Sequence, residues 1–454
     1  MARLPSEVAQ NFGDDLAPNF ALNISGKDTS NQTALFDAVR PLVQSMMFEE
    51  DEEMSSKFEL TLINQPGIAF GQPVNWREVV DSKAFQEGNF IDLFLGYGNT
   101  REYVDRVEIV KWLPDFPASG PATFTIKGYD GRHRMQRGNL VKQKKKRKTF
   151  YKNKPDELIV KEIAAKYGFG VNTDTTEVTR KTTTTTSRGR QVKKHVIPTR
   201  VQAANMSDWQ FLKKLAAINR FDLWVDYDRT QQKWIVNFKK RAEVGLPLFS
   251  FEYNGGDGSL LSAEPDFSIH EQPTDVEVLY FDRKKRSVEL TVIADQNRSE
   301  NVKLGGNVAQ GSRLQAQKQI SSGARVRFTA FGQTIDAFSN KPFRSNKEAK
   351  NFVEHWLRER EREMMILKGV VVGVPSMRAR QIHEFKGMSN RIDGFYRITN
   401  VIHKQAPGSL YTCEFTAHKI LSDSISRKPI TSKPSGRTNV VTKENRKGKF
   451  GAPI

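Results

Sequence analysis

Short segments in which apolar and polar residues alternate recur along most of this 454-residue chain. In the first third, the alternating segments are residues 20–24, 58–63, 89–96, 103–112 and 122–129. A period of two places every second side chain on one face of a strand, so each segment predicts a half-buried β-strand. Turn residues separate the segments, as at 65–67 and 114–121. Many short strands with tight turns predict a small sandwich or barrel. Within this block, residues 33–47 are interpreted as one helix interrupted at Pro41.

The middle of the chain has a different pattern, in which a helix is followed by a strand. Residues 155–167 begin with Pro-Asp-Glu, which suits the first turn of a helix, and carry an apolar stripe. Ser207 and Gln210 form a capping box at the start of a second helix, and an aromatic strand follows at 221–226. The two units align at several identical residues. We therefore predict one helix–strand element used twice, completed by a hairpin within residues 223–238.

From about residue 246 the strand pattern returns. The predicted strands are 248–253, 275–281, 288–293, 325–330, a strand from Val370, 395–401 and 410–417. The polar residues 294–319 predict a long loop. Residues 346–367 predict a long helix, capped by Ser345 with Glu348 and ended by Gly369.

These patterns predict an α+β, β-rich protein in which two barrel domains flank a small α/β module of two helix–strand units. The expected divisions are an N-terminal arm (1–18), a first barrel domain (19–141), an intermediate module (142–245) with a basic, threonine-rich loop at 173–200, a second barrel domain (246–425) that contains the helix 346–367, and a basic C-terminal tail (426–454).

Charge is distributed unevenly along the chain, whose formal net charge is +19. Residues 142–154 hold eight basic side chains and no acid, and residues 427–449 hold eight opposed only by Glu444. Such segments favour an anionic partner: nucleic acid, a membrane surface or an acidic protein face. The acidic block 49–53 is interpreted as a solvated turn, with a basic segment of a neighbouring copy as an alternative partner. The candidate contact residues are Lys142, Lys144, Lys145, Lys146, Arg147, Lys148, Arg427 and Lys428.

Several classes of protein do not fit the sequence. There is no apolar run long enough for a transmembrane helix, so we expect no membrane insertion. The N-terminal residues lack the apolar stretch of a secretory signal. The single cysteine, Cys413, predicts a small buried side chain in a protein that assembles in a reducing cytoplasm.

No catalytic or metal-binding constellation is visible. The seven histidines are scattered without metal-ligand spacing, and nucleotide-binding and nucleophile-elbow motifs are absent. We therefore expect no catalytic residues, no metal and no cofactor, and a protein that is not an enzyme. Any two carboxylates can meet in space, so a hydrolase that cleaves cell-wall polymers is an alternative.

Three groups of segments resemble the late control protein D family of phage tail hubs. The first is residues 201–226, with its Ser-Asp-Trp helix start and aromatic strand. The second is residues 124–132, followed by a basic loop and residues 163–169. The third is residues 393–404 followed by 411–415. The resemblance extends, in order and spacing, over about residues 20–421. The threonine-rich loop, the lysine run and the basic tail depart from the pattern of the family.

The resemblance implies a role as well as a fold. It implies that the two barrels are similar to tail-tube domains, as in the hub part of type VI secretion spikes, and that three chains form a ring that adapts a sixfold tail tube to a threefold spike. The implied partners are further copies of the chain, the tail tube protein, the central spike protein and baseplate wedge proteins. The tape-measure protein or DNA in transit are further candidates. The implied location is the virion tail baseplate, after assembly in the host cytoplasm. The main alternative is a basic nucleic-acid-binding protein whose affinity falls steeply with salt.

Overall fold

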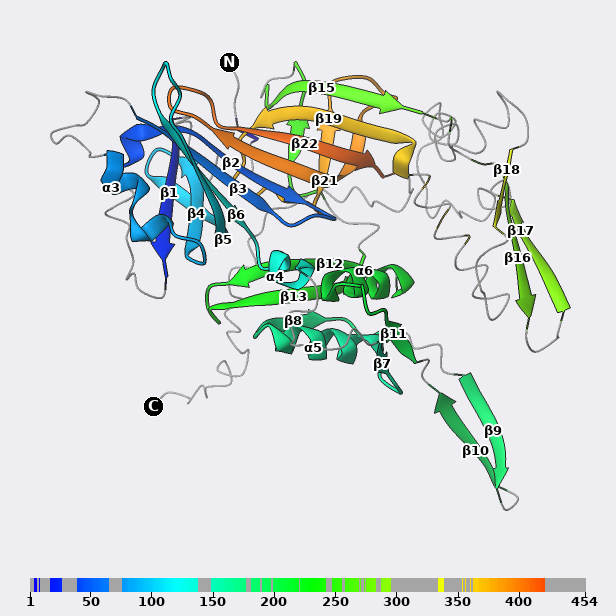
Figure 1. The fold of residues 1–454 in the computed structure, drawn as a ribbon. Helices are drawn as coiled ribbons and strands as arrows, with labels where there is room; N and C mark the ends of the chain where they lie inside the picture. The colour runs from blue at the N-terminus through cyan, green and yellow to red at the C-terminus, as the bar shows by residue number, and fades with distance from the viewer. Residues whose placement is uncertain are drawn as a thin grey trace, which may run out of the picture.

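The computed structural model describes most of the chain between residues 17 and 420. The described ranges are 17–26, 39–64, 76–137, 148–176, 181–196, 199–241, 247–268, 275–294, 334–338 and 362–420, with gaps at 188–189, 220, 255–257 and 283–286, together with the single residues 4, 5, 8, 270, 273, 353, 356 and 360. They form one large sheet, several small sheets and a few helices (Figure 1).

The large sheet has twelve strands, and both strand-rich parts of the chain contribute to it. The first part supplies β1 (Pro18–Ser25), β2 (Val43–Asp51), β3 (Lys57–Ile63), β4 (Phe90–Tyr97), β5 (Thr100–Asp115) and β6 (Thr123–Tyr129). The second part supplies β14 (Ser250–Glu252), β15 (Leu260–Phe267), β19 (Met365–Val372), β20 (Ile382–Lys386), β21 (Gly394–Gln405) and β22 (Thr412–Lys419). Their order is β1-β4-β5-β6-β3-β2-β21-β22-β19-β15, with β20 also paired to β21 and β14 to β20. The prediction of a β-rich α+β protein is confirmed.

Strands β2 and β21 join the two parts of the sheet. They pair antiparallel from Met46 opposite Gln405 to Asp51 opposite Asn400. A second link lies deeper in the core, where the Tyr97 hydroxyl donates to the Gly373 carbonyl at 2.7 Å. Glycine is required there, because a Cβ on Gly373 would lie 2.3 Å from the ring of Tyr411. The two strand-rich parts therefore share one hydrogen-bonded sheet and one continuous apolar core.

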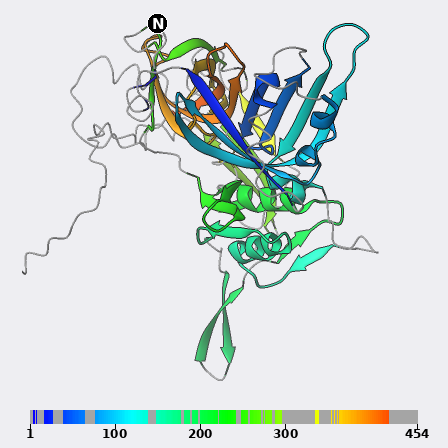
Figure 2. The ribbon, with the colours of Figure 1, turned by 90° about the vertical axis from the view of Figure 1, so that its left-hand side faces the viewer.

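The intermediate module lies beside the large sheet in both views (Figures 1 and 2). Its elements are α4 (Arg132–Gln136), β7 (Thr149–Tyr151), α5 (Asp156–Lys166), β8 (Gly170–Thr173), β11 (Arg200–Gln202), α6 (Asp208–Asn219), β12 (Phe221–Asp228) and β13 (Lys233–Lys240). β13 pairs antiparallel with β12 and parallel with β8, so the strands of the two helix–strand units lie on either side of it. The predicted capping box is confirmed: the Ser207 hydroxyl accepts from the amide of Gln210 at 3.1 Å, and the Gln210 side chain accepts from the amide of Ser207 at 3.0 Å. This module has its own apolar core.

The remaining elements are short. They are η1 (Arg40–Leu42), α3 (Trp76–Val80), η2 (Lys83–Phe85), the hairpin of β9 (Lys181–Ser187) and β10 (Arg190–Val196), and the sheet of β16 (Asp275–Asp282), β17 (Ser287–Ala294) and β18 (Ile335–Phe338). No helix in the described ranges is long and apolar enough to cross a membrane.

The prediction of a helix over residues 33–47 is wrong at its C-terminal end. Pro41 lies in η1, and β2 begins at Val43. Methionine and glutamate favour helices in isolation, but Met46 and Phe48 alternate into the core, and this burial overrides local propensity.

Two further predictions need correction. The expected loop 173–200 contains the β9–β10 hairpin, which agrees with the β-branched character of its threonine run. The helix predicted over 346–367 is helical at residues 353, 356, 360, 362 and 363, but it ends too late, because β19 already begins at Met365. Strands β15, β18 and β20 were not expected. The predicted strand 325–330 and nearly all of the loop 294–319 lie outside the described residues.

His383 and His403 offer a matched test of how the core of the second part is built. Both are fully buried, but neither ring nitrogen of His383 has a hydrogen-bond partner, whereas His403 bonds to Tyr411 at 2.6 Å and to the Met377 carbonyl at 3.0 Å. Because an unsatisfied buried polar group is costly, His383→Phe should raise the free energy of unfolding by about 1 kcal/mol, while His403→Phe should lower it by about 1–3 kcal/mol. Urea unfolding of the two variants measures both changes, and equal destabilisation would contradict this account.

His383 and His403 also make the stability of the fold depend on pH. Burial lowers the pKa of His383, and of His403, to about 3. Both stay neutral in the fold, while the unfolded chain takes up a proton at each site below about pH 6.5. Their contribution is therefore complete above pH 6.5 and is lost as the pH falls toward 3, by up to about 1.4 kcal/mol per pH unit for each group. His383→Phe should reduce this slope by one proton in urea titrations between pH 6 and 4.

Candidate functional site: the charged junction and exposed surfaces

The module is attached to the large sheet by a ring of two guanidinium groups and two carboxylates. Arg397 in β21 donates to Glu52 and to Asp222, each at 2.8 Å. Arg241, just after β13, donates to the same two carboxylates at 2.9 and 2.7 Å. Glu52 follows β2 and Asp222 lies in β12. Each of the two arginines therefore bridges a residue of the sheet part to a residue of the module.

A second cluster continues this junction inward. The Glu50 carboxylate forms ion pairs with Arg378, at 3.4 Å, and with Arg380. The Arg380 guanidinium also lies 5.1 Å from the ring centroid of Trp224 in β12. Burial alone would raise the pKa of Glu50, but the positive charges of Arg378 and Arg380 outweigh it and lower that pKa below its usual value. Glu50 is therefore ionised inside the protein at neutral pH.

The far end of the β12–β13 hairpin is held by arginine and aromatic contacts. Arg106 in β5 donates to both oxygens of Asp92, at 2.6 and 2.7 Å, and to the Tyr227 hydroxyl at 2.6 Å. Its guanidinium lies 4.0 Å from the Tyr227 ring centroid. Arg229, from the module, lies 4.9 Å from the ring centroid of Tyr103. One cation–π contact thus places an arginine of the sheet on a ring of the module, and the other places an arginine of the module on a ring of the sheet. Together with the ion pairs, these contacts fix the orientation of the module.

Two further buried acids at the junction, Asp105 and Asp226, are harder to ionise than Glu50 and Glu52. Burial raises the pKa of Asp105 well above its usual value, and the nearby negative charges of Asp226 and Glu50 raise it further. Burial also raises the pKa of Asp226, which accepts hydrogen bonds from Trp224 at 2.6 Å and from Asn237 at 3.0 Å. As the pH falls, protons are expected at these two carboxyls before they reach Glu50 or Glu52.

The prediction that the acidic block 49–53 is a solvated turn is wrong for Glu49, Glu50 and Asp51, whereas Glu53 is exposed in the bend that follows β2. Glu49, Glu50 and Asp51 end strand β2, and Glu50 is only 5% exposed. The partners of Glu50 and Glu52 are arginines of the same chain rather than of a neighbouring copy. The sequence does carry a signal that Glu50 is buried, because Glu50 continues the alternation of inward-facing residues that begins with Met46 and Phe48.

A buried cluster resembles a thiol–imidazole pair. The Cys413 sulfur lies 3.3 Å from Nδ1 of His403, which also bonds to the Tyr411 hydroxyl. Burial raises the pKa of the Cys413 thiol to about 12, and burial lowers the pKa of His403 to about 3. A nucleophile needs a thiolate and access to substrate, and this cluster has neither. The expected buried position of Cys413 is confirmed.

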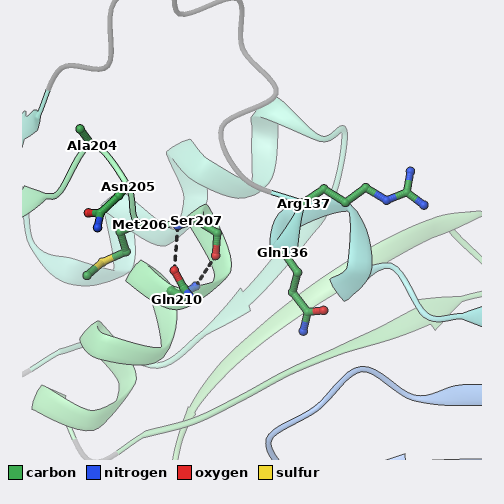
Figure 3. A pocket seen from close by; sticks show the side chains of 7 residues that line it. All are labelled: Gln136, Arg137, Ala204, Asn205, Met206, Ser207 and Gln210. Atoms are coloured by element: carbon green, nitrogen blue, oxygen red, sulfur yellow. Dashed lines mark hydrogen bonds between the residues drawn. The ribbon is translucent and has the colours of Figure 1, made fainter.

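The hollow beside the start of α6 is polar and open (Figure 3). It has a volume of about 340 Å³, and its lining residues are Gln136, Arg137, Ala204, Asn205, Met206, Ser207 and Gln210. Ser207 and Gln210 bond to each other's backbone, and the side chain of Arg137 extends away from them. These groups do not converge on a ligand. Within the described part of the chain, no group of three or more His, Cys, Asp or Glu residues could hold a metal ion.

Of the predicted contact residues, the structure places Lys148, which is exposed immediately before β7. The other candidates lie outside the described residues: Lys142, Lys144, Lys145, Lys146, Arg147, Arg427 and Lys428. An apolar surface that the sequence patterns do not predict lies on the β5–β6 hairpin, where Trp112, Leu113 and Phe116 are 40%, 36% and 66% exposed. Exposed apolar side chains gathered on one hairpin are typical of contact surfaces.

Comparison with known proteins gives a likeness only at the level of structure. No family model matches the sequence, and no curated protein matches it. The 43 kDa tail protein of prophage MuSo2 from Shewanella oneidensis matches with a TM-score of 0.58 at 12% identity, covering 89% of this chain and 99% of that protein. A tail protein from Neisseria meningitidis MC58 matches with a TM-score of 0.56 at 9% identity, covering 90% and 99%.

The chain has the fold of these tail proteins. The likeness covers both strand-rich parts and the module between them, since it extends over about nine-tenths of the chain and nearly all of each tail protein. It agrees with the resemblance of residues 201–226 to the tail-hub family.

Arg397→Met tests whether the junction holds the module in place. The change leaves Glu52 and Asp222 with one arginine instead of two. Because breaking a buried ion pair costs about 3–5 kcal/mol, we expect the free energy of unfolding to fall by about 3 kcal/mol. The control Lys404→Met breaks the more exposed pair with Glu414 and should cost less than about 1 kcal/mol. Thermal unfolding and hydrogen exchange of β12 measure the two effects. Equal small losses of stability in the two variants would show that the junction contributes little to holding the module in place.

The junction should also weaken in acid. Burial opposes ionisation of Glu52, but the Arg397 and Arg241 guanidinium groups outweigh it and hold the pKa at about 2. A carboxyl with a lowered pKa stabilises the fold fully above its unfolded value of about 4.5 and loses that contribution as the pH falls toward 2. The protection factors of the β12 amides, which correct for the intrinsic slowing of exchange in acid, should therefore fall below pH 4.5 in the unmodified protein.

Proposed function

We propose that this chain is a structural hub protein in the baseplate of a phage-like contractile tail. The observation that carries the proposal is the match over nearly the whole length of two tail proteins, which includes the module as well as the sheet. Fold likeness alone allows many functions, so the proposal also depends on what the surfaces of this chain can do.

A rigid adaptor needs its parts fixed relative to one another. The shared sheet, the ring of Arg397, Arg241, Glu52 and Asp222, and the Arg106 contacts with Tyr227 supply that rigidity. A rigid protein whose Cys413–His403 pair is buried in the core and neutral suits a structural role rather than catalysis.

We propose that three copies close into a ring, and that the ring adapts a sixfold tail tube to a threefold central spike. The two ends of the described sheet, β1 and β15, are different surfaces, so contact between them on successive copies is heterologous. Heterologous contacts produce a closed ring when the rotation between copies fits. In β15 most residues are exposed, including Leu261 at 37%, which suits packing against another copy.

The other proposed partners follow from this position. They are the tail tube protein on one side, the central spike protein on the other and baseplate wedge proteins around the rim. The β5–β6 hairpin, with exposed Trp112 and Phe116, is the surface we assign to one of these neighbouring proteins. The proposed location is the virion tail, after assembly in the host cytoplasm.

Mass photometry of the purified chain tests the ring. We expect particles of about 155 kDa, three times the chain mass of 51.7 kDa, which persist at 0.5 M salt because hydrogen bonds between strand edges, unlike exposed ion pairs, are not screened by salt. Leu261→Arg should lower the trimer fraction at least fivefold. Met54→Arg, which alters a side chain that is 61% exposed in the turn after β2, should leave it unchanged. A single species at 51.7 kDa at micromolar concentration would contradict a ring that closes by itself.

A further inference from the structure

The β9–β10 hairpin projects from the module as a separate two-stranded ribbon, in both views (Figures 1 and 2). Its seven residue pairs run from Arg190 opposite Ser187 to Val196 opposite Lys181. In the described part of the chain, its strands pair only with each other. At about 3.4 Å per residue, the ribbon is about 20 Å long. Isolated hairpins are marginally stable in water, so this one makes sense as a surface that is completed by a partner.

The ribbon carries charge of one sign. Residues 181–196 contain five lysines and arginines and no acid. With residues 142–154 and 427–449, they account for +20, so the rest of the chain carries a net charge of −1. The body of the protein therefore has no general excess of positive charge, and the ribbon is a local feature that favours an anionic partner.

The composition of the ribbon favours phosphate over protein carboxylates. Five consecutive threonines supply hydroxyl groups, which contact phosphates in nucleic-acid complexes as lysine and arginine do. Protein interfaces rely on aromatic and large apolar anchors, but β9 and β10 contain no apolar residue larger than valine. A two-stranded β-ribbon also fits the major groove of duplex DNA, which is about 12 Å wide.

In the module, the β7–β11 ladder lies close to the ribbon in the sequence and carries an exposed aromatic ring. Arg200, four residues after the end of β10, donates to both oxygens of the buried Asp156 carboxylate at 2.8 and 2.7 Å. It pairs in the β7–β11 ladder with Tyr151, whose ring stacks on Phe211 at 5.5 Å. Phe150, on the outer face of that ladder, is 57% exposed. Lys148, two residues before Phe150, is exposed and adds a positive charge beside this ring.

From these observations we propose that the β9–β10 ribbon is a binding element for duplex DNA, which contacts the phosphate backbone without reading sequence. The inference goes beyond the hub role and does not depend on it, because it concerns only what the ribbon binds.

The test compares two triple variants of the full chain that remove the same charge. Arg190→Gln/Lys193→Gln/Lys194→Gln changes the ribbon. Lys83→Gln/Lys111→Gln/Lys233→Gln changes three exposed lysines on the body. Fluorescence anisotropy with a labelled 24-base-pair duplex gives Kd from 50 to 300 mM salt, and poly-aspartate of matched charge serves as the competing anion. Thermal midpoints and particle masses equal to those of the unmodified chain show that folding and assembly are intact.

We expect the ribbon variant to bind the duplex at least tenfold more weakly at 100 mM salt, and the body variant less than twofold more weakly. The slope of log Kd against log salt should fall by about 2–3 in the ribbon variant alone, since each lost phosphate contact accounts for about 0.9. Equal weakening in both variants would overturn the proposal in favour of diffuse net charge. Ribbon-dependent binding that poly-aspartate matches or exceeds would overturn it in favour of an acidic protein partner.

Discussion

The relation between the large sheet and the module depends on two glutamates that remain ionised inside the protein. Glu50 and Glu52 stand at the end of β2, the strand that joins the two parts of the sheet through β21. A buried carboxylate is costly unless it is paired, and here the pairs are arginines from distant parts of the sequence, among them Arg397. Ion pairs of this kind act as orientation devices more than as sources of stability, because they are satisfied only when the sheet and the module meet in one geometry. Apolar packing alone would tolerate small rotations of the module, whereas hydrogen-bonded guanidinium groups do not.

Much of the fold could be predicted from local sequence, since a period of two identifies a strand regardless of its partner. That is why β1, β3, β4 and β6 were found close to their true positions. The sequence does not predict strand β2, because methionine and glutamate favour helices locally, whereas the strand is stabilised by pairing on both sides, with β3 nearby and with β21 some 350 residues away. Hydrophobic alternation does not predict the β9–β10 hairpin, because its threonine run lacks large apolar residues, although threonine has a high β-propensity.

The site was less predictable than the fold. Runs of charge in a sequence are typical of exposed segments, and for this reason the sequence predicts a contact surface at Lys148 and its basic neighbours. The charges that position the module are instead single residues spread among apolar strands, such as Arg397 in β21 and Asp222 in β12. Their pairing is a tertiary property that no local pattern encodes. The one available signal was an acid at an inward-facing position of a strand, which is expensive to bury and therefore implies a partner.

Single-particle electron microscopy of the isolated chain at micromolar concentration tests the hub proposal most directly. We expect threefold-symmetric rings with a central opening, in which β1 of one copy lies against β15 of the next and the module keeps one orientation in every copy. Compact asymmetric particles, or twofold dimers joined through a surface other than the sheet ends, would contradict the ring and with it the proposed role as an adaptor between tube and spike.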